Sequence, residues 1–357
     1  MMRIALGSLT AMVVLPFALA ACGGDTPPPE TAHNDVSTPP KLPPSMMGKT
    51  GASPAGSADM PQGAAANDEV AKGMKALETG DLPGAKTHFE AAIKKNPKDV
   101  EALAYLGRVA DEQGDKATAE KRYKEALKNV PDFEPAAEDL SALYVLASKW
   151  DDAIAVARPT LAKHPSNGAL HMNLATALAG KGDPAASAKE FDEAIRIVPS
   201  DPNYLYDYAH WLIVWKQPDV ALTKLRAARP LTTDPKLLGA IGFEMRLAGG
   251  FADCVPTYDK AIAGLDAAEF RTDRALCKLG LKDKAGALAD LQAAVAKEPA
   301  NARAHYYLGG RFAEAGKVKE AIVEYEAYVK LAPSGDLAKQ AQERIKIMKS
   351  GKPPAKK

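Results

Sequence analysis

The feature that most constrains this chain is a proline that returns at a fixed interval. Four prolines follow one another at 34-residue steps, and two more near the C-terminus are again 34 apart: Pro97, Pro131, Pro165, Pro199, and then Pro299 and Pro333. Ahead of most of them stands a series of small, small, aromatic and small residues, as in Gly107, Ala119, Tyr123 and Ala126 before Pro131. Proline interrupts helices, and a period of 20 to 50 residues indicates stacked repeats.

This 34-residue pattern resembles the tetratricopeptide repeat, in which each unit is two antiparallel helices that cross closely at the small residues. The resemblance implies an all-α chain, a right-handed α-solenoid of about eight helix-turn-helix repeats over residues 66–335. The fifth and sixth repeats are each one residue short, and the third is degenerate, with Ser141 and Ala157 at the glycine and aromatic positions. The eight repeats are expected to start at Ala66, Val100, Glu134, Gly168, Pro202, Pro235, Ala268 and Ala302.

The residues that follow the last repeat predict one more helix. Over 336–348, apolar residues recur at helical spacing: Leu337, Ala341, Ile345 and Met348. A helix of this kind covers the open end of a repeat stack. The remaining residues, 349–357, form a basic tail that we expect to be disordered and solubilising, with contact to an anionic surface as the alternative.

The N-terminus has the features of an export signal. Arg3 precedes an apolar stretch, Ile4 to Phe17, that is too short to cross a bilayer comfortably. The sequence Leu19-Ala20-Ala21-Cys22 resembles the lipobox of bacterial lipoproteins. The resemblance implies that residues 1–21 are a cleaved signal peptide and that Cys22 carries the lipid; the alternative is an ordinary secretory signal. Residues 22–65, rich in Pro, Ala and Gly, predict a disordered tether.

Composition and motifs argue against several classes of function. The chain of 357 residues has 46 Lys and Arg against 45 Asp and Glu, whereas nucleic-acid binders usually need a basic excess. Its six histidines are scattered without metal-ligand spacing, and its carboxylates alternate with lysines, as in Glu120 and Lys124. No catalytic motif is present. We therefore expect no enzyme activity, no cofactor, no metal site, no nucleic-acid partner and no small-molecule substrate.

The family resemblance also suggests where a partner would bind. In tetratricopeptide repeats, positions 2, 5, 9 and 12 of each unit face the concave side. These positions predict a groove that is acidic toward the N-terminal end and aromatic and basic toward the middle and C-terminal end. Aromatic and arginine side chains are common anchors for partners. The groove residues expected to bind are Met172, Asn203, Tyr206, His210, Lys236, Phe243, Arg246, Arg303 and Tyr306.

Two cysteines within the repeats could form a disulfide or remain separate. Cys254 and Cys277 fall in the second helix of the sixth repeat and the first helix of the seventh, which are neighbours in such stacks. Outside the cytoplasm they can form a disulfide if their Cα atoms lie within about 7 Å. Otherwise they are two small buried residues.

Together these patterns predict a membrane-anchored, extracytoplasmic scaffold that binds a protein or peptide partner in its groove, in assembly of a cell-envelope complex. One alternative is a regulator of a cell-wall synthase or hydrolase. Another is an enzyme whose site is dispersed along the groove, which would require Tyr206, His210 and Arg246 to converge on a deep pocket. We expect the anchor to lie in the outer membrane, facing the periplasm, in a diderm source, and otherwise on the outer face of the cell membrane.

Overall fold

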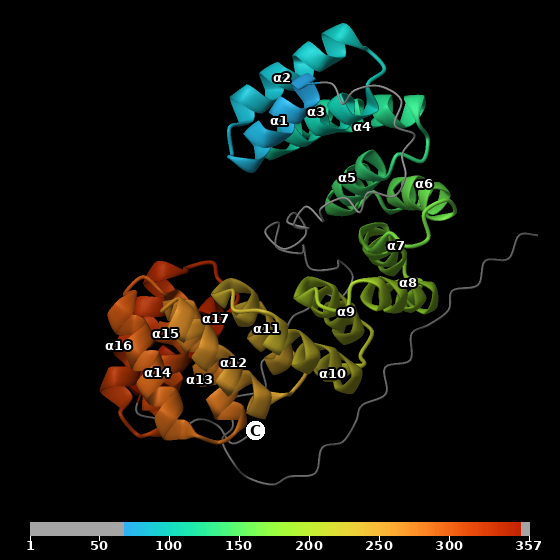
Figure 1. Cartoon of the computed structure of the whole chain (residues 1–357). Coiled ribbons are helices and arrows are strands. Elements are labelled where there is room, and N and C mark those ends of the chain that lie inside the picture. The colour runs from blue at the N-terminus through green and yellow to red at the C-terminus, as the bar shows by residue number, and fades with distance from the viewer. Residues whose placement is uncertain (1–67, 351–357) are drawn as a thin grey trace, which may run out of the picture.

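A computed structural model of the protein describes residues 68–350 and shows 17 α-helices and one short 3-10 helix, with no strand among those residues (Figure 1). The predicted signal peptide, Cys22, the tether and the last seven residues of the tail lie outside the described residues. The first eight helices are α1 (Asp68–Glu78), α2 (Leu82–Lys95), α3 (Val100–Glu112), α4 (Lys116–Asn129), α5 (Glu134–Leu146), α6 (Trp150–Leu161), α7 (Gly168–Gly180) and α8 (Pro184–Ile197). The others are α9 (Pro202–Val214), α10 (Pro218–Ala228), η1 (Arg229–Leu231), α11 (Pro235–Leu247), α12 (Phe251–Gly264), α13 (Ala268–Gly280), α14 (Lys284–Lys297), α15 (Ala302–Glu314), α16 (Val318–Leu331) and α17 (Ala338–Ser350).

The helices follow the period that the prolines indicated. Seven of the eight expected repeat starts coincide with the first residue of a helix, and α2, α4, α8, α14 and α16 each end two residues before the recurring proline. The turn inside each repeat also recurs, because it contains one residue with positive φ every 33 or 34 positions. These residues are Gly80, Gly114, Ser148, Gly182, Lys216, Gly249, Lys282 and Gly316. The all-α repeat fold predicted from the sequence is confirmed.

In five of the eight helix pairs an aromatic ring of the second helix packs against a small residue of the first, whereas Ala157, Leu225 and Leu291 stand at the ring position of the third, fifth and seventh pairs. A Cβ atom added to Gly107 of α3 would lie 2.7 Å from the ring of Tyr123 in α4. The same geometry joins Gly242 of α11 to Tyr258 of α12, at 2.8 Å. Both rings are almost fully buried. The small positions are therefore small because the ring of the second helix fills the space at the crossing.

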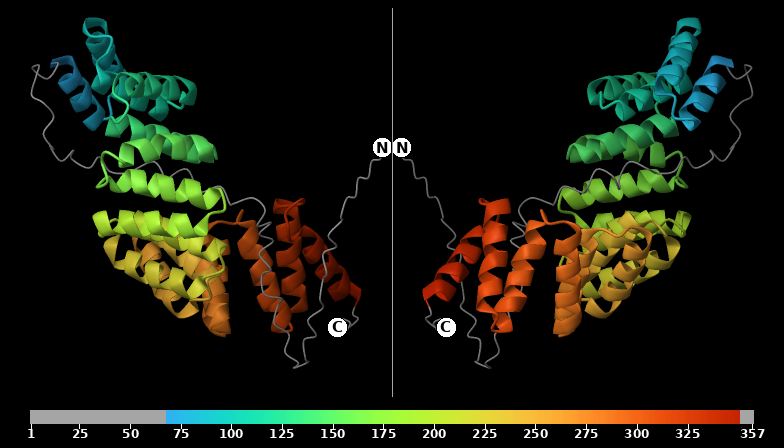
Figure 2. Two further views of the ribbon diagram at one scale, coloured as in Figure 1. Left: turned by 90° about the vertical axis from the view of Figure 1, so that its right-hand side faces the viewer. Right: turned by 90° about the vertical axis from the view of Figure 1, so that its left-hand side faces the viewer.

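The eight pairs stack side by side along a curved path (Figure 2). Second helices pack against the first helix of the next repeat, as α6 does on α7 and α12 on α13. Neighbouring first helices also contact one another, as α3 and α5, α5 and α7, and α11 and α13 do. The first helices therefore line the inner side of the curve, and the second helices lie outside (Figure 1).

The stack ends in α17, which packs on α16. Ala341 of α17 is fully buried in a cluster with Tyr306, Tyr325 and Tyr328, and Ile345 and Met348 pack against the same cluster. The helix begins two residues later and ends two residues later than the segment predicted from spacing. Its apolar side covers the last repeat, which has no ninth repeat beside it.

We predict that Gly107→Ala destabilises the stack. The added methyl group collides with the Tyr123 ring, so the free energy of unfolding should fall by about 1–3 kcal/mol in chemical denaturation. Gly310→Ala is the matched control. Its Cβ would lie 3.5 Å from the Tyr325 hydroxyl, an ordinary contact, so the better helix propensity of alanine should raise stability by about 0.5–1 kcal/mol. Equal effects of the two substitutions would contradict the close-crossing account.

Candidate functional site

The predicted groove residues divide into a buried group and an exposed group. Met172, Tyr206, His210, Arg246 and Tyr306 are each at most 9% exposed. Lys236, Phe243 and Arg303 are exposed, and Asn203 is half-buried. Five of the nine predicted groove residues are therefore buried, and partner binding by the nine stays a prediction. Neighbouring first helices lie close enough that side chains at these positions pack between helices.

The polar members of the buried group link adjacent repeats. His210 Nδ1 of α9 lies 2.9 Å from Glu244 Oε1 of α11, and the Tyr306 hydroxyl of α15 donates to Gln340 Oε1 of α17 at 3.0 Å. Both pairs are separated by 34 residues. Glu244 and Gln340 were not predicted as partners from the sequence. The period is a signal that could have found them, since residues about one period apart lie at similar heights on adjacent helices of the inner side.

The His210–Glu244 pair favours a charged imidazole. Burial by itself lowers the pKa of His210, but the hydrogen bond to Glu244 and the charges of Glu244 and Asp207 outweigh it. The net effect raises the pKa of His210 above its ordinary value. This histidine therefore ties α9 to α11 as part of a charge-assisted link.

The exposed members gather around α11. Phe243 is 37% exposed, and the Arg246 guanidinium lies over its ring, 5.0 Å from the centroid. Asp273 of α13 lies 3.8 Å from Arg246 and accepts a 3.0 Å hydrogen bond from Arg303 of α15. We call Lys236, Phe243, Arg246 and Arg303 the inner strip. It presents one apolar ring and two exposed cationic side chains from α11 and α15, which Asp273 of α13 connects.

One buried carboxylate on the inner wall has no arginine or lysine bound to it. Asp207 of α9 is 8% exposed, and its Oδ1 atom accepts no hydrogen bond from any described residue. Burial is the main cause that raises the pKa of Asp207, to about 7. The charge of Asp201 also raises this pKa, and the charge of His210 lowers it. The carboxylate is therefore only partly ionised at neutral pH.

Cys254 and Cys277 form a disulfide between α12 and α13, with their Cα atoms 6.1 Å apart. Both residues are fully buried. Cys254 occupies a small position of the sixth repeat, where the helices cross, and Cys277 comes from the adjacent first helix. The bond therefore fastens the sixth repeat to the seventh.

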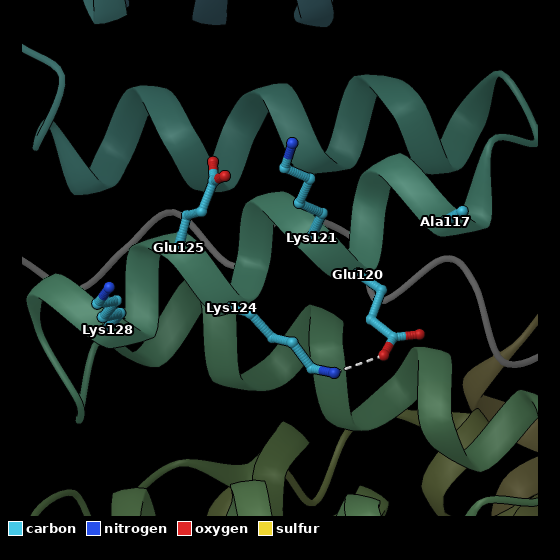
Figure 3. A pocket seen from close by; sticks show the side chains of 6 residues that line it. All are labelled: Ala117, Glu120, Lys121, Lys124, Glu125 and Lys128. Carbon is cyan, nitrogen blue, oxygen red and sulfur yellow. Dashed lines mark hydrogen bonds and ion pairs between the residues drawn. The ribbon is translucent and has the colours of Figure 1, made fainter.

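A hollow on the outer face lies along a single helix, α4 (Figure 3). Its lining is charged, and Lys124 Nζ donates to Glu120 Oε1 at 2.6 Å, which confirms the pair predicted from their spacing. All of its lining comes from one exposed helix face, so the hollow is a gap between long surface side chains. The lining residues are Ala117, Glu120, Lys121, Lys124, Glu125 and Lys128.

Among residues 68–350, no group of three or more His, Cys, Asp or Glu side chains is arranged to hold a metal ion. None of the helices in this range combines the length and apolar character needed to cross a membrane.

Known proteins show the same repeat. A tetratricopeptide repeat family model matches residues 70–132, 140–202 and 272–336, together more than half of the chain. Protein FlbA of Caulobacter vibrioides is 26% identical over 166 residues, which cover 46% of this chain and 28% of FlbA. This chain thus spans less than a third of that relative.

Solved structures extend the likeness to the fold. PilW, described as a widely conserved type IV pilus biogenesis factor, is 16% identical with a TM-score of 0.52, over 58% of this chain and 96% of PilW. A chain of the APC/C hetero-tetramer Cut9–Hcn1 is 13% identical with a TM-score of 0.49, over 74% of this chain and 52% of that one. At 16% identity the likeness to PilW is one of fold alone.

We predict that Asp207→Asn stabilises the protein in a pH-dependent way. An unfolded aspartate titrates near pH 4, whereas folded Asp207 holds its proton to about pH 7, so wild-type stability falls as the pH rises between these values. Above pH 7 the variant should gain roughly 2–4 kcal/mol over wild type in denaturant titrations, and the gain should shrink toward pH 4.

The matched control for this prediction is Asp273→Asn. Asp273 holds the same register in the seventh repeat but is paired with Arg303, so its loss should destabilise the protein at pH 7. If Asp207→Asn leaves the pH dependence of stability unchanged, Asp207 is not the buried acid described.

Proposed function

Because the chain belongs to the tetratricopeptide repeat family, we propose that it is a lipid-anchored, extracytoplasmic adaptor that binds a protein partner on the inner wall of its solenoid. Proteins of this repeat act as scaffolds for protein interactions, and partner binding in general follows from the family. We further propose the lipid anchor on Cys22, the extracytoplasmic compartment and the inner wall as the binding surface. The observation that carries it is the inner strip.

The inner strip has the composition of a partner-binding surface. Phe243 is a large apolar side chain that remains more than one-third exposed. The Arg246 guanidinium packs over one face of its ring. Asp273 connects Arg246 to Arg303, so the strip is continuous from α11 to α15. An aromatic anchor beside arginine is typical of residues that dominate binding energy at interfaces. A partner segment lying along the inner wall would cover Phe243 and pair with Lys236 and Arg303.

The disulfide supports an extracytoplasmic location. Disulfides persist in oxidising compartments and are rare among cytosolic proteins. Cys254 and Cys277 are buried at a helix crossing, where the bond is shielded from solvent. The N-terminal sequence Leu19-Ala20-Ala21-Cys22 supports the same compartment independently, since it resembles a lipoprotein signal.

The fold neighbours suggest the process that such an adaptor serves. PilW, which shares the fold, is a pilus biogenesis factor. We therefore propose assembly of a cell-envelope complex as the role of this chain, on the periplasmic face of the outer membrane in a diderm source or the outer face of the membrane otherwise. The alternative is regulation of a cell-wall synthase or hydrolase. Identification of the partner would distinguish this role from assembly of an envelope complex.

We predict that Cys22→Ser releases the protein from the membrane. Several acyl chains on Cys22 provide a stable anchor, and without them no lipid holds the chain. In fractionated cells, wild type should sediment with membranes and incorporate labelled palmitate, and the variant should do neither. Gly23→Ser, next to the attachment site, is the control and should behave as wild type. Membrane association of Cys22→Ser equal to that of wild type would refute the lipid anchor.

We predict that a photo-crosslinking amino acid in place of Phe243 captures a defined partner in intact envelopes. The same amino acid in place of Val323, which is 61% exposed on the outer helix α16, is the matched control and should not capture that partner. A partner captured through the outer position alone would contradict binding on the inner wall. Mass spectrometry of the crosslinked band identifies the partner and separates an assembly factor from a cell-wall enzyme.

A further inference from the structure

Three consecutive first helices, α5, α7 and α9, form a wall without lysine or arginine, to which α5 and α9 contribute acidic side chains. The sequences of α5, α7 and α9 contain no basic residue except histidine. The second helices beside them differ, since α6 carries Arg158, α8 carries Arg196 and α10 carries Lys224. We call the carboxylates of this part of the inner side the acidic wall; they are Glu134, Glu138, Asp139 and Asp207. Basic residues return to the first helices at α11.

The carboxylates of the acidic wall are only partly neutralised within the chain. Glu134 and Glu138 both accept hydrogen bonds from the side-chain amide of Asn167, at 2.6 and 2.5 Å. An amide satisfies an acceptor but carries no charge, so Asn167 neutralises neither carboxylate. Glu134 Oε1 also lies 3.0 Å from His164 Nδ1, whereas Glu138 forms no ion pair with the described residues. Burial raises the pKa of Glu138, which reflects the cost of holding its charge here.

Comparison of equivalent positions shows what Asp207 lacks. Asp139, Asp207 and Asp273 occupy the sixth position of the third, fifth and seventh repeats. Arg108 binds Asp139 through two hydrogen bonds of 3.1 Å, and Arg303 binds Asp273 at 3.0 Å. This position of the repeat therefore accepts a guanidinium from the inner side in both cases where one is available.

The fifth repeat has no residue that supplies this cation. The position equivalent to Arg108 is Thr176, and the position equivalent to Arg303 is Lys236, which is exposed and forms no ion pair with Asp207. Glu244, beside His210, likewise has one buried oxygen, Oε2, that accepts no hydrogen bond from the described residues. Two buried carboxylate oxygens thus remain unpaired at neighbouring points of α9 and α11.

Asp207 lies at a register of the repeat that a guanidinium reaches elsewhere in the stack. Asp273, at the equivalent position, is 7% exposed with Arg303 bound to it, and the Arg303 side chain is 43% exposed; Asp207 is 8% exposed with no such side chain on it. The arginine stem lies in solvent, and the guanidinium reaches the carboxylate from the inner side. A side chain from a partner can approach Asp207 by the same route.

We infer that the acidic wall is the docking surface for a basic segment of the partner protein, whose arginine or lysine takes at Asp207 the place that Arg108 and Arg303 take at Asp139 and Asp273. The inference rests on the proposed adaptor function and specifies the chemistry of its partner. Charge-assisted, two-pronged contacts favour arginine over lysine at such carboxylates. The segment lies along α5, α7 and α9, and its other cations pair with Glu134 and Glu138.

The test is fluorescence anisotropy with the full chain and a labelled probe peptide of the sequence Gly-Ser-Arg repeated three times. The control probe has citrulline in place of each arginine, which keeps the shape and removes the charge. We expect the arginine probe to bind, and the citrulline probe to bind at least about tenfold more weakly, the usual effect of losing a charge-assisted hydrogen bond. Binding should also weaken as salt is raised.

Variants locate the binding. Asp207→Asn should weaken the arginine probe by at least about tenfold, and because this variant is expected to be more stable than wild type, misfolding does not explain the loss. Glu120→Gln, on the outer face of α4, is the matched control and should bind as wild type does. Equal affinity for the two probes, or undiminished binding to Asp207→Asn, overturns the inference.

Other occupants give different results. If the chain's own basic tail fills the wall, deleting residues 351–357 should strengthen probe binding. If a second copy fills it, sedimentation should show a dimer that Asp207→Asn disperses. Either result overturns a partner's segment as the occupant. Capture of a partner through Phe243 without arginine-probe binding leaves the proposed function standing and removes this inference alone. Binding of the arginine probe without capture through Phe243 supports the acidic wall as a docking surface and contradicts partner binding at the inner strip.

Discussion

A single helix pair of this chain cannot bury its own apolar surface, and the stacking that covers this surface is the constraint on which the rest of the structure depends. Within most pairs, a ring such as Tyr123 fills the space left by a small residue such as Gly107. Between pairs, the second helix packs on the next first helix, and the largest buried cluster runs from α7 to α13. At the C-terminal end, α17 replaces the missing neighbour. Stability is therefore shared between adjacent repeats.

Stacking also determines which polar groups meet. Adjacent first helices bring side chains about one period apart into contact, as in His210 with Glu244 and Tyr306 with Gln340. Residues that the family pattern assigns to a groove, such as His210 and Tyr306, therefore connect adjacent repeats instead. The surface left for a partner is consequently smaller than the pattern implies, and it is concentrated in the inner strip and the acidic wall.

The inner wall changes its charge along the stack. From α5 to α9 it carries carboxylates with few cations, whereas Lys236, Arg246 and Arg303 follow from α11 to α15. The change falls at the contact between α9 and α11, where His210 and Glu244 join the two parts. The disulfide at α12 and α13 fastens the repeats immediately beyond it. A partner segment that spans this boundary would need basic residues on one side and acidic or aromatic residues on the other.

The period, the helix starts and the small positions could all be predicted from the sequence, because each is a local requirement repeated every 34 residues. Proline ends a helix wherever it stands, and a ring needs a small partner at the crossing, as Gly242 and Tyr258 show. The exposure of Tyr206, His210 and Arg246 could not be predicted in this way. It depends on the distance between neighbouring first helices, which is set by packing across repeats. The absence of an arginine or lysine bound to Asp207 could not be predicted from the sequence either. An ion pair between repeats forms only where the stack brings both residues together.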